Sequence, residues 1–460
     1  MGIERKVNRD DWRKSLQKIK NFPGVLTNLL SDYWPRLLLG VGIALATALA
    51  WVFQSELLPK TRSVIGLFCF FGIAFLWSTD WRQIDRRTVI TGLLLQIVLG
   101  LLILRVSWVY RQFETLGAVA RSFLEFSEKG AVFVFGDLGK TGGPFAFHVL
   151  PTVIFVSAFF SMLYYLGILQ WLVYLIARGM LLLLGKRAVS GAETLSVSAN
   201  VFIGQTEAPL IIKPFIPGMT RSELLAIMIA GMAHISGTLM AVYIGMGADA
   251  VAIFATSVMG APASLYLSKI LIPETGEPQT RGSLKMSQDQ SSANLIDAAS
   301  AGASEGMKLV LNIAAMLIAF LALIAMVNQI LIYFHPNLTL EKIFGSLFSP
   351  IACLMGIESN DIPKVGEWLG IKLISNEFVA YLELQNYIAA GHVLDHRTIQ
   401  LTTFALTGFA NIASVGIQLG GIGAMAPERR KDLAQLGWRA LFAGFLATLI
   451  NATIAGILTH

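Results

Sequence analysis

Charged side chains are scarce in this chain, and cysteine is nearly absent. Asp, Glu, Lys and Arg together make up 14% of the 460 residues, whereas a soluble domain carries about 25%. Hydrophobic residues reach 55%, and the mean hydropathy is +0.65. This composition excludes intrinsic disorder, and two cysteines are too few for a disulfide-stapled secreted module. It indicates a membrane protein.

Motifs of familiar enzymes and ATP-driven pumps are also missing. The sequence has no HExxH, no Walker loop and no GxSxG, so we expect neither enzymatic activity nor a cofactor. The net charge of +6 does not indicate nucleic-acid binding, because the basic residues form no dense stripe. They lie between apolar segments, where contact with the inner membrane surface explains them.

Long apolar runs dominate what is present. A helix needs about 20 apolar residues to cross a bilayer, and such runs predict an all-α polytopic membrane protein with about nine transmembrane helices. The run 36–54 is expected to be an extra amino-terminal helix, and 110–129 an amphipathic interfacial one. The nine predicted crossings are 36–54, 62–78, 88–105, 147–176, 223–246, 250–271, 307–334, 397–424 and 436–458.

Two further hydrophobic regions are too interrupted to cross. Residues 190–215 are broken by Gly204-Gln205-Thr206-Glu207-Ala208-Pro209, and residues 364–390 by Ser375-Asn376-Glu377. Each arm is about half the length that a crossing needs. Polar backbone at membrane depth persists only where protein or water surrounds it. Both regions are therefore predicted to be re-entrant hairpins whose tips meet near the midplane.

The hairpins divide the chain into two repeats. Each is followed by a predicted crossing that small and polar residues interrupt, 223–246 and 397–424, and this pairing is typical of a transporter site between repeats. The bias of Lys and Arg between loops predicts a cytoplasmic amino terminus and hairpins that enter from opposite sides, so that the repeats are inverted. The expected parts are a basic cytoplasmic segment 1–35, the helix 36–54, scaffold 62–176, first transport repeat 177–271, polar linker 272–300, long scaffold helix 301–336 and second transport repeat 337–460.

Two acidic residues lie at the predicted hairpin tips. Ionisable groups inside a membrane are costly and usually mark a path for substrate or ions. Glu207 and Glu377 can each accept two charge-assisted hydrogen bonds, which suits a vicinal diol. Gln205, Thr206 and Asn411 add amide and hydroxyl groups, and such a set favours a neutral heterocycle that carries hydroxyls. A structural reading, in which the carboxylates cap half-helices or pair with a buried lysine, stays open.

An anionic substrate is disfavoured by what the broken helices lack. Neither 223–246 nor 397–424 contains Lys or Arg, apart from the terminal Arg397, although anions are normally held by such residues. Phe409, two residues before Asn411, can stack on a base, but a membrane-helix Phe is more often a packing residue.

Five ordered motifs resemble the concentrative nucleoside transporter family, of the bacterial nucleoside permease type. The similarity extends over roughly residues 62–460. The motifs are SANVFIGQTEAPL at 198–210, LNIAAM at 311–316, FSPI at 348–351, NEFVAY at 376–381, and GFAN at 408–411 with Ser414.

This resemblance implies a homotrimer in which a mobile region holding the hairpins moves like an elevator against a scaffold. It places Gln205, Thr206 and Glu207 at the nucleobase, and Glu377, Asn411 and Ser414 at the ribose hydroxyls. Phe409 would contact the base, and Leu239 would line the pocket. Nucleosides would be imported by cation symport across the plasma membrane, the inner membrane of a bacterium. An ion channel, or a carrier for another small neutral polar solute, is the alternative.

The resemblance also bears on the coupling ion. In sodium-driven members the ion lies at positions that match the Asn200 side chain, the Ile203 and Ile235 carbonyls, and residue 234. A small hydroxyl is usual at the last position, but this chain has His234. A hard cation prefers oxygen ligands, whereas an imidazolium can replace a cation electrostatically. Proton coupling and sodium coupling, with Ser236 or water completing the ion's shell, both stay open.

Overall fold

The computed structural model describes residues 22–140, 142–185, 189–284, 286 and 292–459. Within these ranges the chain is helical and forms no β-strand, which confirms the predicted all-α fold. The α-helices are α2 (Phe22–Val52), α3 (Pro59–Leu76), α4 (Arg86–Arg105), α5 (Ser107–Phe135), α6 (Phe145–His148), α7 (Leu150–Tyr165), α8 (Ile168–Leu184), α9 (Gly191–Ala199), α10 (Arg221–Ala233), α11 (Gly237–Gly245), α12 (Ala250–Leu271), α13 (Leu295–Phe334), α14 (Leu340–Met355), α15 (Ile362–Ile374), α16 (Glu377–Ala389), α17 (His396–Leu406), α18 (Ile412–Met425) and α19 (Arg430–Leu458). The 3₁₀-helices are η1 (Trp81–Gln83), η2 (Gly136–Gly139), η3 (Ala208–Gly218) and η4 (Pro427–Arg429).

Eight helical segments of the described chain are long and apolar enough to cross a membrane, one fewer than the nine predicted. The difference lies in 397–424, which the structure divides into α17 and α18 with 11 and 14 residues. Neither piece reaches the length of about 20 residues that a crossing needs. The two pieces can span only together, as a broken helix.

The predicted crossing 147–176 is wrong as a single helix. The structure ends α7 at Tyr165 and begins α8 at Ile168, with Gly167 between them at φ +77°. A residue in this left-handed conformation interrupts an α-helix, and glycine adopts it without strain. The run 36–54 also differs in extent, because α2 already begins at Phe22. Residues 1–21 of the predicted basic segment 1–35 lie outside the described residues.

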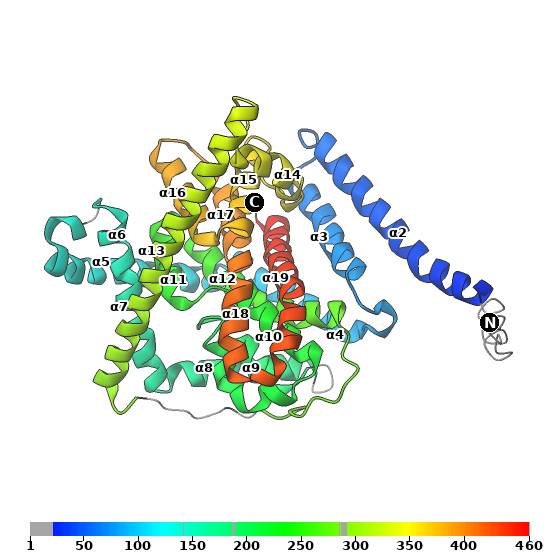
Figure 1. Ribbon diagram of the computed structural model, residues 1–460, viewed down its shortest axis with the longest axis horizontal. Coiled ribbons are helices and arrows are strands. Elements are labelled where there is room, and N and C mark those ends of the chain that lie inside the picture. The colour runs from blue at the N-terminus through cyan, green and yellow to red at the C-terminus, as the bar shows by residue number, and fades with distance from the viewer. Residues whose placement is uncertain (1–21, 141, 186–188, 285, 287–291, 460) are drawn as a thin grey trace, which may run out of the picture.

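The two predicted hairpins lie at opposite ends of the helical body. In Figure 1, α9 lies at the bottom and α15 and α16 lie at the top. The hairpin 190–215 consists of α9, a turn and the 3₁₀-helix η3, whereas the hairpin 364–390 consists of α15 and α16. Their opposite placement agrees with an inverted arrangement of the repeats.

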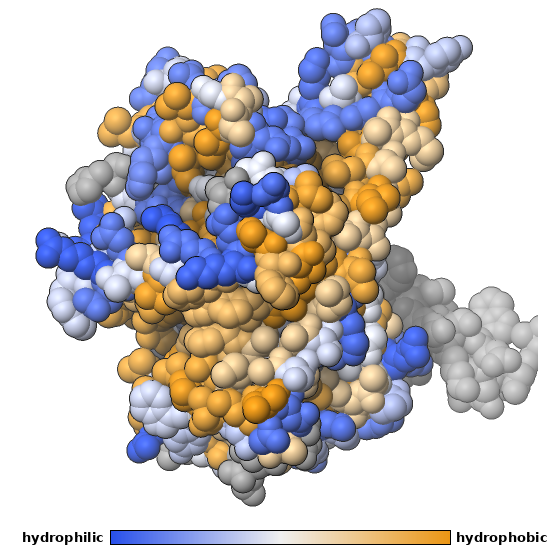
Figure 2. Space-filling view, turned by 90° about the vertical axis from the view of Figure 1, so that its left-hand side faces the viewer, coloured by the Kyte–Doolittle hydropathy of each residue, from blue (hydrophilic) through white to orange (hydrophobic). Residues whose placement is uncertain are grey.

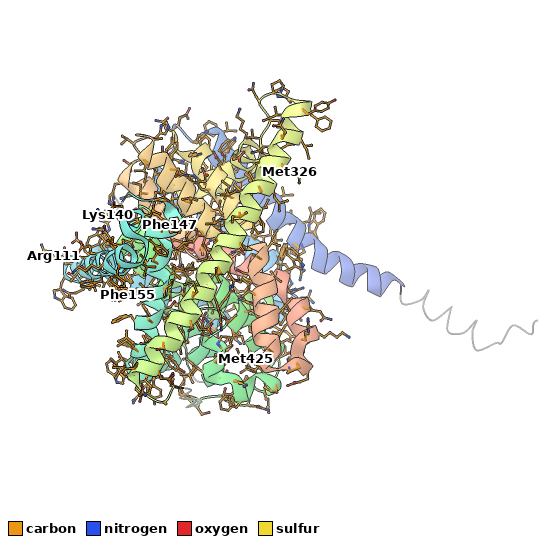
Figure 3. All side chains as sticks on the ribbon, turned by 60° about the vertical axis from the view of Figure 1, so that its left-hand side comes forward. Arg111, Lys140, Phe147, Phe155, Met326 and Met425 are labelled. Atoms are coloured by element: carbon orange, nitrogen blue, oxygen red, sulfur yellow. The ribbon has the colours of Figure 1, made fainter. Side chains whose placement is uncertain are left out.

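The most buried helices are those of the two repeats. In the most apolar stretch of each segment, the share of residues that are buried is 89% for α10–α11 and for α12 and 83% for η4 with α19, against 11% for α13 and 6% for the Trp34–Val52 part of α2. The long α13 runs across the outside of the molecule, packed against α7, and α2 extends away from the body (Figure 1). Figure 3 shows α13 with Met326 near its far end, and places Arg111 and Lys140 on the projecting region around α5.

A membrane-facing surface is visible on the outside of the body. Figure 2 shows a broad hydrophobic band between hydrophilic regions above and below. Exposed apolar side chains of α13 contribute to the hydrophobic exterior, among them Leu311, Ile318, Leu323, Met326 and Ile330. Apolar side chains are stable on the outside only where lipid or another apolar surface covers them.

Arg397 ties together three helix ends at one margin of the body. It is the second residue of α17 and is 6% exposed. Its guanidinium donates to the carbonyl of Gly356 after α14 at 3.2 Å and to that of Gly456 in the last turn of α19 at 2.6 Å. It also donates to the hydroxyl of Thr459 at 2.9 Å. These bonds satisfy acceptors that the helix ends leave free.

We expect Arg397→Gln to destabilise the protein by at least about 2 kcal/mol, because buried carbonyls lose charged donors. The loss would be measured as a lower melting temperature in detergent. Arg87→Gln is the matched control, since Arg87 is exposed in the first turn of α4. Equal melting temperatures for the two variants would contradict the capping role.

Candidate functional site

The two broken helices cross at their breaks. Between α17 and α18, the Phe409 amide donates to the carbonyl oxygen of His234, which lies between α10 and α11, at 3.1 Å. The neighbouring Gly408 has φ +142°, and a Cβ atom there would lie 2.9 Å from the Met232 carbonyl oxygen. Only glycine fits this conformation and this contact. The crossing brings the interrupted backbone of both repeats to one place.

Glu377 lies at the tip of the second hairpin, on the first residue of α16. The preceding Asn376 caps the helix by accepting from the Val379 amide at 2.9 Å. The Glu377 carboxylate is buried and accepts from the Tyr243 hydroxyl of α11 and from the Asn411 amide nitrogen Nδ2, both at 3.0 Å. A negative charge at a helix amino terminus is stabilised by the helix dipole.

Asn411 has two tasks. Its Oδ1 caps α18 by accepting from the Ser414 amide at 2.9 Å, while its Nδ2 donates to Glu377. The Ser414 hydroxyl in turn accepts from Gln205 Nε2 at 3.3 Å, and Gln205 Oε1 accepts from Gln418 Nε2 at 3.2 Å. A continuous polar chain therefore runs from the first hairpin through α18 to the second hairpin.

The remaining predicted substrate residues make no side-chain hydrogen bond to this polar chain in the part of the protein that the structure describes. Leu239 is buried on α11, and Phe409 is partly buried beside the crossing. The Thr206 methyl group lies against Gly421 of α18. Glu207 is exposed, and its carboxylate folds over Gly204 rather than bonding to the second hairpin. The two tips are therefore linked only through α18, which Gln205 reaches from the first hairpin and Glu377 from the second, and no hydrogen bond in the described chain joins Glu207 to Glu377.

Two residues of the polar chain escaped the sequence analysis. Tyr243 follows Leu239 by four residues on α11, and Gln418 follows Ser414 by four on α18. Residues at this spacing share one face of a helix. The spacing was available in the sequence, but tyrosine and glutamine in apolar helices give no sign by themselves of what they contact.

The predicted cation position has an unusual geometry. Asn200 is buried at the end of α9, and its Nδ2 donates to the Ser196 carbonyl at 3.0 Å. The buried ring of His234 places Nδ1 2.7 Å from the Ala230 carbonyl oxygen and Nε2 2.9 Å from that of Ser257. Since both ring nitrogens face hydrogen-bond acceptors, neither presents a lone pair to a metal ion. Backbone oxygens, such as those of Ile203 and Ile235, are the better ligands for sodium.

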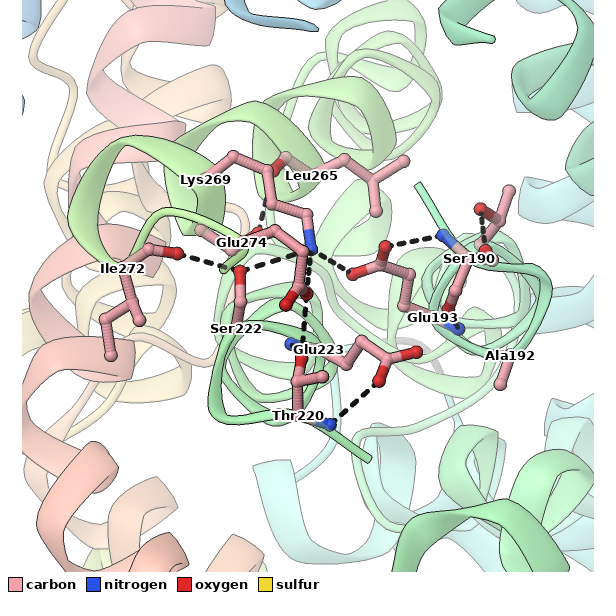
Figure 4. Close-up of polar contacts among 12 residues, drawn as sticks. Ser190, Ala192, Glu193, Thr220, Ser222, Glu223, Leu265, Lys269, Ile272 and Glu274 are labelled. Atoms are coloured by element: carbon pink, nitrogen blue, oxygen red, sulfur yellow. Dashed lines mark hydrogen bonds and ion pairs between the residues drawn. The ribbon is translucent and has the colours of Figure 1, made fainter. Parts of the chain in front are cut away.

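A buried ion-pair network holds the base of the first hairpin (Figure 4). Lys269 Nζ of α12 lies 2.8 Å from Glu193 Oε2 of α9, 3.2 Å from the Ser222 hydroxyl and 3.4 Å from Glu274 Oε2. Glu193 and Glu223 each complete a capping box at the start of α9 and α10. The amino-terminal ends of these helices are thereby fastened to α12, which leaves the tip as the freer part of the hairpin.

We expect Tyr243→Phe to weaken nucleoside binding about tenfold, with uridine as the test ligand. A hydrogen bond to a charged group contributes about 1.5–3 kcal/mol, and its loss leaves the Glu377 carboxylate less well oriented. Isothermal titration would measure the dissociation constant. Tyr387→Phe is the control, because that ring stacks on His392 away from Glu377. An unchanged constant for Tyr243→Phe would contradict the orienting role.

Comparison with known proteins gives consistent matches over most of the chain. Residues 65–138 match the description "Na+ dependent nucleoside transporter N-terminus", residues 146–250 match "Nucleoside recognition", and residues 252–456 match "Na+ dependent nucleoside transporter C-terminus". The chain is 42% identical to sodium/nucleoside cotransporter 1 of Mus musculus, covering 91% of this chain and 67% of that protein. It is 41% identical to the uncharacterized transporter YutK of Bacillus subtilis, covering 86% and 98%.

Solved structures agree with the sequence matches. CNTnw in an inward-facing substrate-bound state superposes with a TM-score of 0.82 at 38% identity, covering 87% of this chain and 98% of that one. A variant of CNTnw in an outward-facing state matches equally well, with a TM-score of 0.82 and the same coverage. With the three matched regions and the full-length bacterial relative, these likenesses show that the chain belongs to the Na+ dependent nucleoside transporter family.

Proposed function

We propose that this protein is a secondary active transporter that imports nucleosides together with a cation by alternating access. One observation carries the proposal. Glu377, Asn411 and Ser414 form one buried hydrogen-bonded set at the tip of the second hairpin and the break of α18. A carboxylate next to an amide and a hydroxyl is suited to the two neighbouring hydroxyls of a ribose.

The nucleobase would be held by the first hairpin. Gln205 can donate and accept at a base edge, and Thr206 adds a hydroxyl beside α18. Glu207 would have to leave its contact with Gly204 to reach the base. Phe409 and Leu239 would provide the apolar contacts of the pocket, on either side of the crossing. On binding, the nucleoside would replace the direct bond between Gln205 and Ser414.

The alternatives predict different transport behaviour. A channel would need a continuous pore, whereas here the first hairpin is joined to α18 through Gln205. A carrier exchanges labelled for unlabelled nucleoside with saturation, and counterflow in proteoliposomes tests this directly. A carrier for another neutral solute would show no competition by nucleosides.

We expect Glu377→Gln to reduce uridine uptake at least tenfold, because a charge-assisted bond to the ribose contributes about 1.5–3 kcal/mol. The change should appear mainly as a higher KM in initial-rate uptake. Glu383→Gln is the matched control, because Glu383 lies on the same helix without a hydrogen bond to the polar chain. Unaltered uptake by Glu377→Gln would refute the ribose assignment.

The division between buried repeats and exposed α13 is consistent with a fixed part and a moving part. We propose a homotrimer in the plasma membrane, with α13 and its apolar side chains at the subunit contacts. The repeats would then move as an elevator against this fixed part. Bacterial relatives support an inner-membrane location, and the loop charges support a cytoplasmic amino terminus with the first hairpin entering from that side.

Sodium is the coupling ion that family membership supports, and the geometry of His234 favours the proton as a second candidate. A neutral imidazole donates from one nitrogen only, but an imidazolium donates from both. Two carbonyl oxygens within 2.9 Å of the ring therefore suit the protonated form. An imidazolium here would supply the positive charge that sodium supplies in relatives with a hydroxyl at this position.

We expect uridine uptake by the His234→Ser variant to depend more strongly on sodium than uptake by the parent protein. The reason is that a hydroxyl oxygen, which can ligate sodium, replaces a ring that cannot. Uptake would be measured in proteoliposomes with a sodium gradient or with an acid-outside pH gradient in sodium-free medium. His396→Ser, at an exposed position, is the control. Strict sodium dependence of the parent, with no response to pH, would eliminate the proton.

A further inference from the structure

The second repeat contains a buried lysine that the proposed transport cycle has not used. Lys372 lies on α15, the first arm of the second hairpin, and is fully buried. Its Nζ donates to the Ala405 carbonyl oxygen at 2.7 Å and to the Thr448 hydroxyl at 3.2 Å. It also lies 5.4 Å from the centre of the Phe445 ring. Within the described chain these hydrogen-bond partners are neutral, and no carboxylate is paired with it.

The groups around the ammonium favour its charged form and oppose the cost of burying it. Ala405 is in the last turn of α17, which ends inside the protein at Leu406. The end of a half-helix carries partial negative charge on its free carbonyl groups, and such ends hold coupling ions in transporters built from broken helices. The aromatic face of Phe445 adds a further favourable contact for a cation.

In the first repeat, the His234 ring occupies the corresponding place. There α10 precedes the break and α12 is the long helix behind it, as α17 and α19 are in the second repeat. The His234 ring bridges the Ala230 carbonyl in the last turn of α10 and the Ser257 carbonyl of α12. Lys372 likewise bridges the last turn of α17 and α19 through Thr448.

We propose that Lys372 is a tethered cation that fills the cation position of the second repeat and balances the charge of Glu377. Lys372 precedes Glu377 by five residues, on the other arm of the same hairpin, and opposite charges held close together in the protein interior attract each other. The first repeat then exchanges its cation with the solution, while the second keeps its own. The role of Lys372 in transport rests on the proposed function, whereas the charge balance between Lys372 and Glu377 does not.

A double-mutant cycle tests the charge balance without transport. Lys372→Met removes the charge at nearly constant volume and leaves Glu377 as an uncompensated buried carboxylate, which is strongly destabilising. We expect a large fall in melting temperature for Lys372→Met and recovery of most of it in Lys372→Met with Glu377→Gln. Lys364→Met is the matched control on the same helix, because Lys364 is ion-paired with Glu367 and only partly buried. A double variant as unstable as Lys372→Met alone would overturn the proposal.

Uridine uptake provides the second readout. In Lys372→Gln the vacated position offers oxygen ligands at the end of α17, so a solution cation should enter it. We expect the dependence of initial uptake on sodium concentration to become steeper than in the parent, with a higher Hill coefficient, while Lys372→Arg keeps the parent's value. Unchanged steepness in Lys372→Gln would overturn the tethered-cation role. A failure of the proposed function itself would appear differently, as absent uridine uptake by the parent.

Discussion

Backbone groups at the ends of half-helices have to be satisfied inside the membrane, because lipid offers them no hydrogen bonds. Each break in this protein meets that constraint with a polar side chain. Asn411 caps α18 and Asn376 caps α16, while Lys372 serves the end of α17. At the end of α10, the His234 ring nitrogen Nδ1 lies within hydrogen-bond distance of the Ala230 carbonyl oxygen. Interrupting the helices is therefore what places polar and charged groups at the centre of the molecule.

The same groups connect the two repeats. Asn411 both caps α18 and holds Glu377, and Ser414 receives Gln205 from the first hairpin. Such shared partners make the hairpins and broken helices one mechanical unit, since moving one end displaces the rest. At its base the first hairpin is fastened by the ion pair of Lys269 with Glu193, which leaves the tip less constrained than the base.

The arrangement of charge differs between the two repeats although their architecture is alike. In the second repeat, a lysine from the hairpin lies behind the buried carboxylate at the tip. In the first repeat, the tip carboxylate of Glu207 is exposed and the group behind it is a histidine between two carbonyl oxygens. A lysine ammonium and a histidine ring thus occupy related positions, at the ends of α17 and α10.

Local composition is enough to predict much of this protein. Hydropathy over about 20 residues finds most crossings because a bilayer requires that length, and polar residues within apolar runs reveal both hairpins and both breaks. Glu377, Asn411 and Gln205 were identified in this way, whereas Ser414 was identified through the family resemblance. The exception at 147–176 arose because hydropathy does not register the left-handed backbone of Gly167.

The partners of these residues depend on packing between distant segments. Tyr243 reaches Glu377 across 134 positions, and Gln418 reaches Gln205 across 213. Tyr and Gln in apolar helices look alike in sequence whether they face lipid, core or site. Their roles emerge when α11, α16 and α18 come together, because a hydrogen bond needs both atoms within about 3 Å. Sequence periodicity specifies the face of a helix, but the folded chain specifies what that face meets.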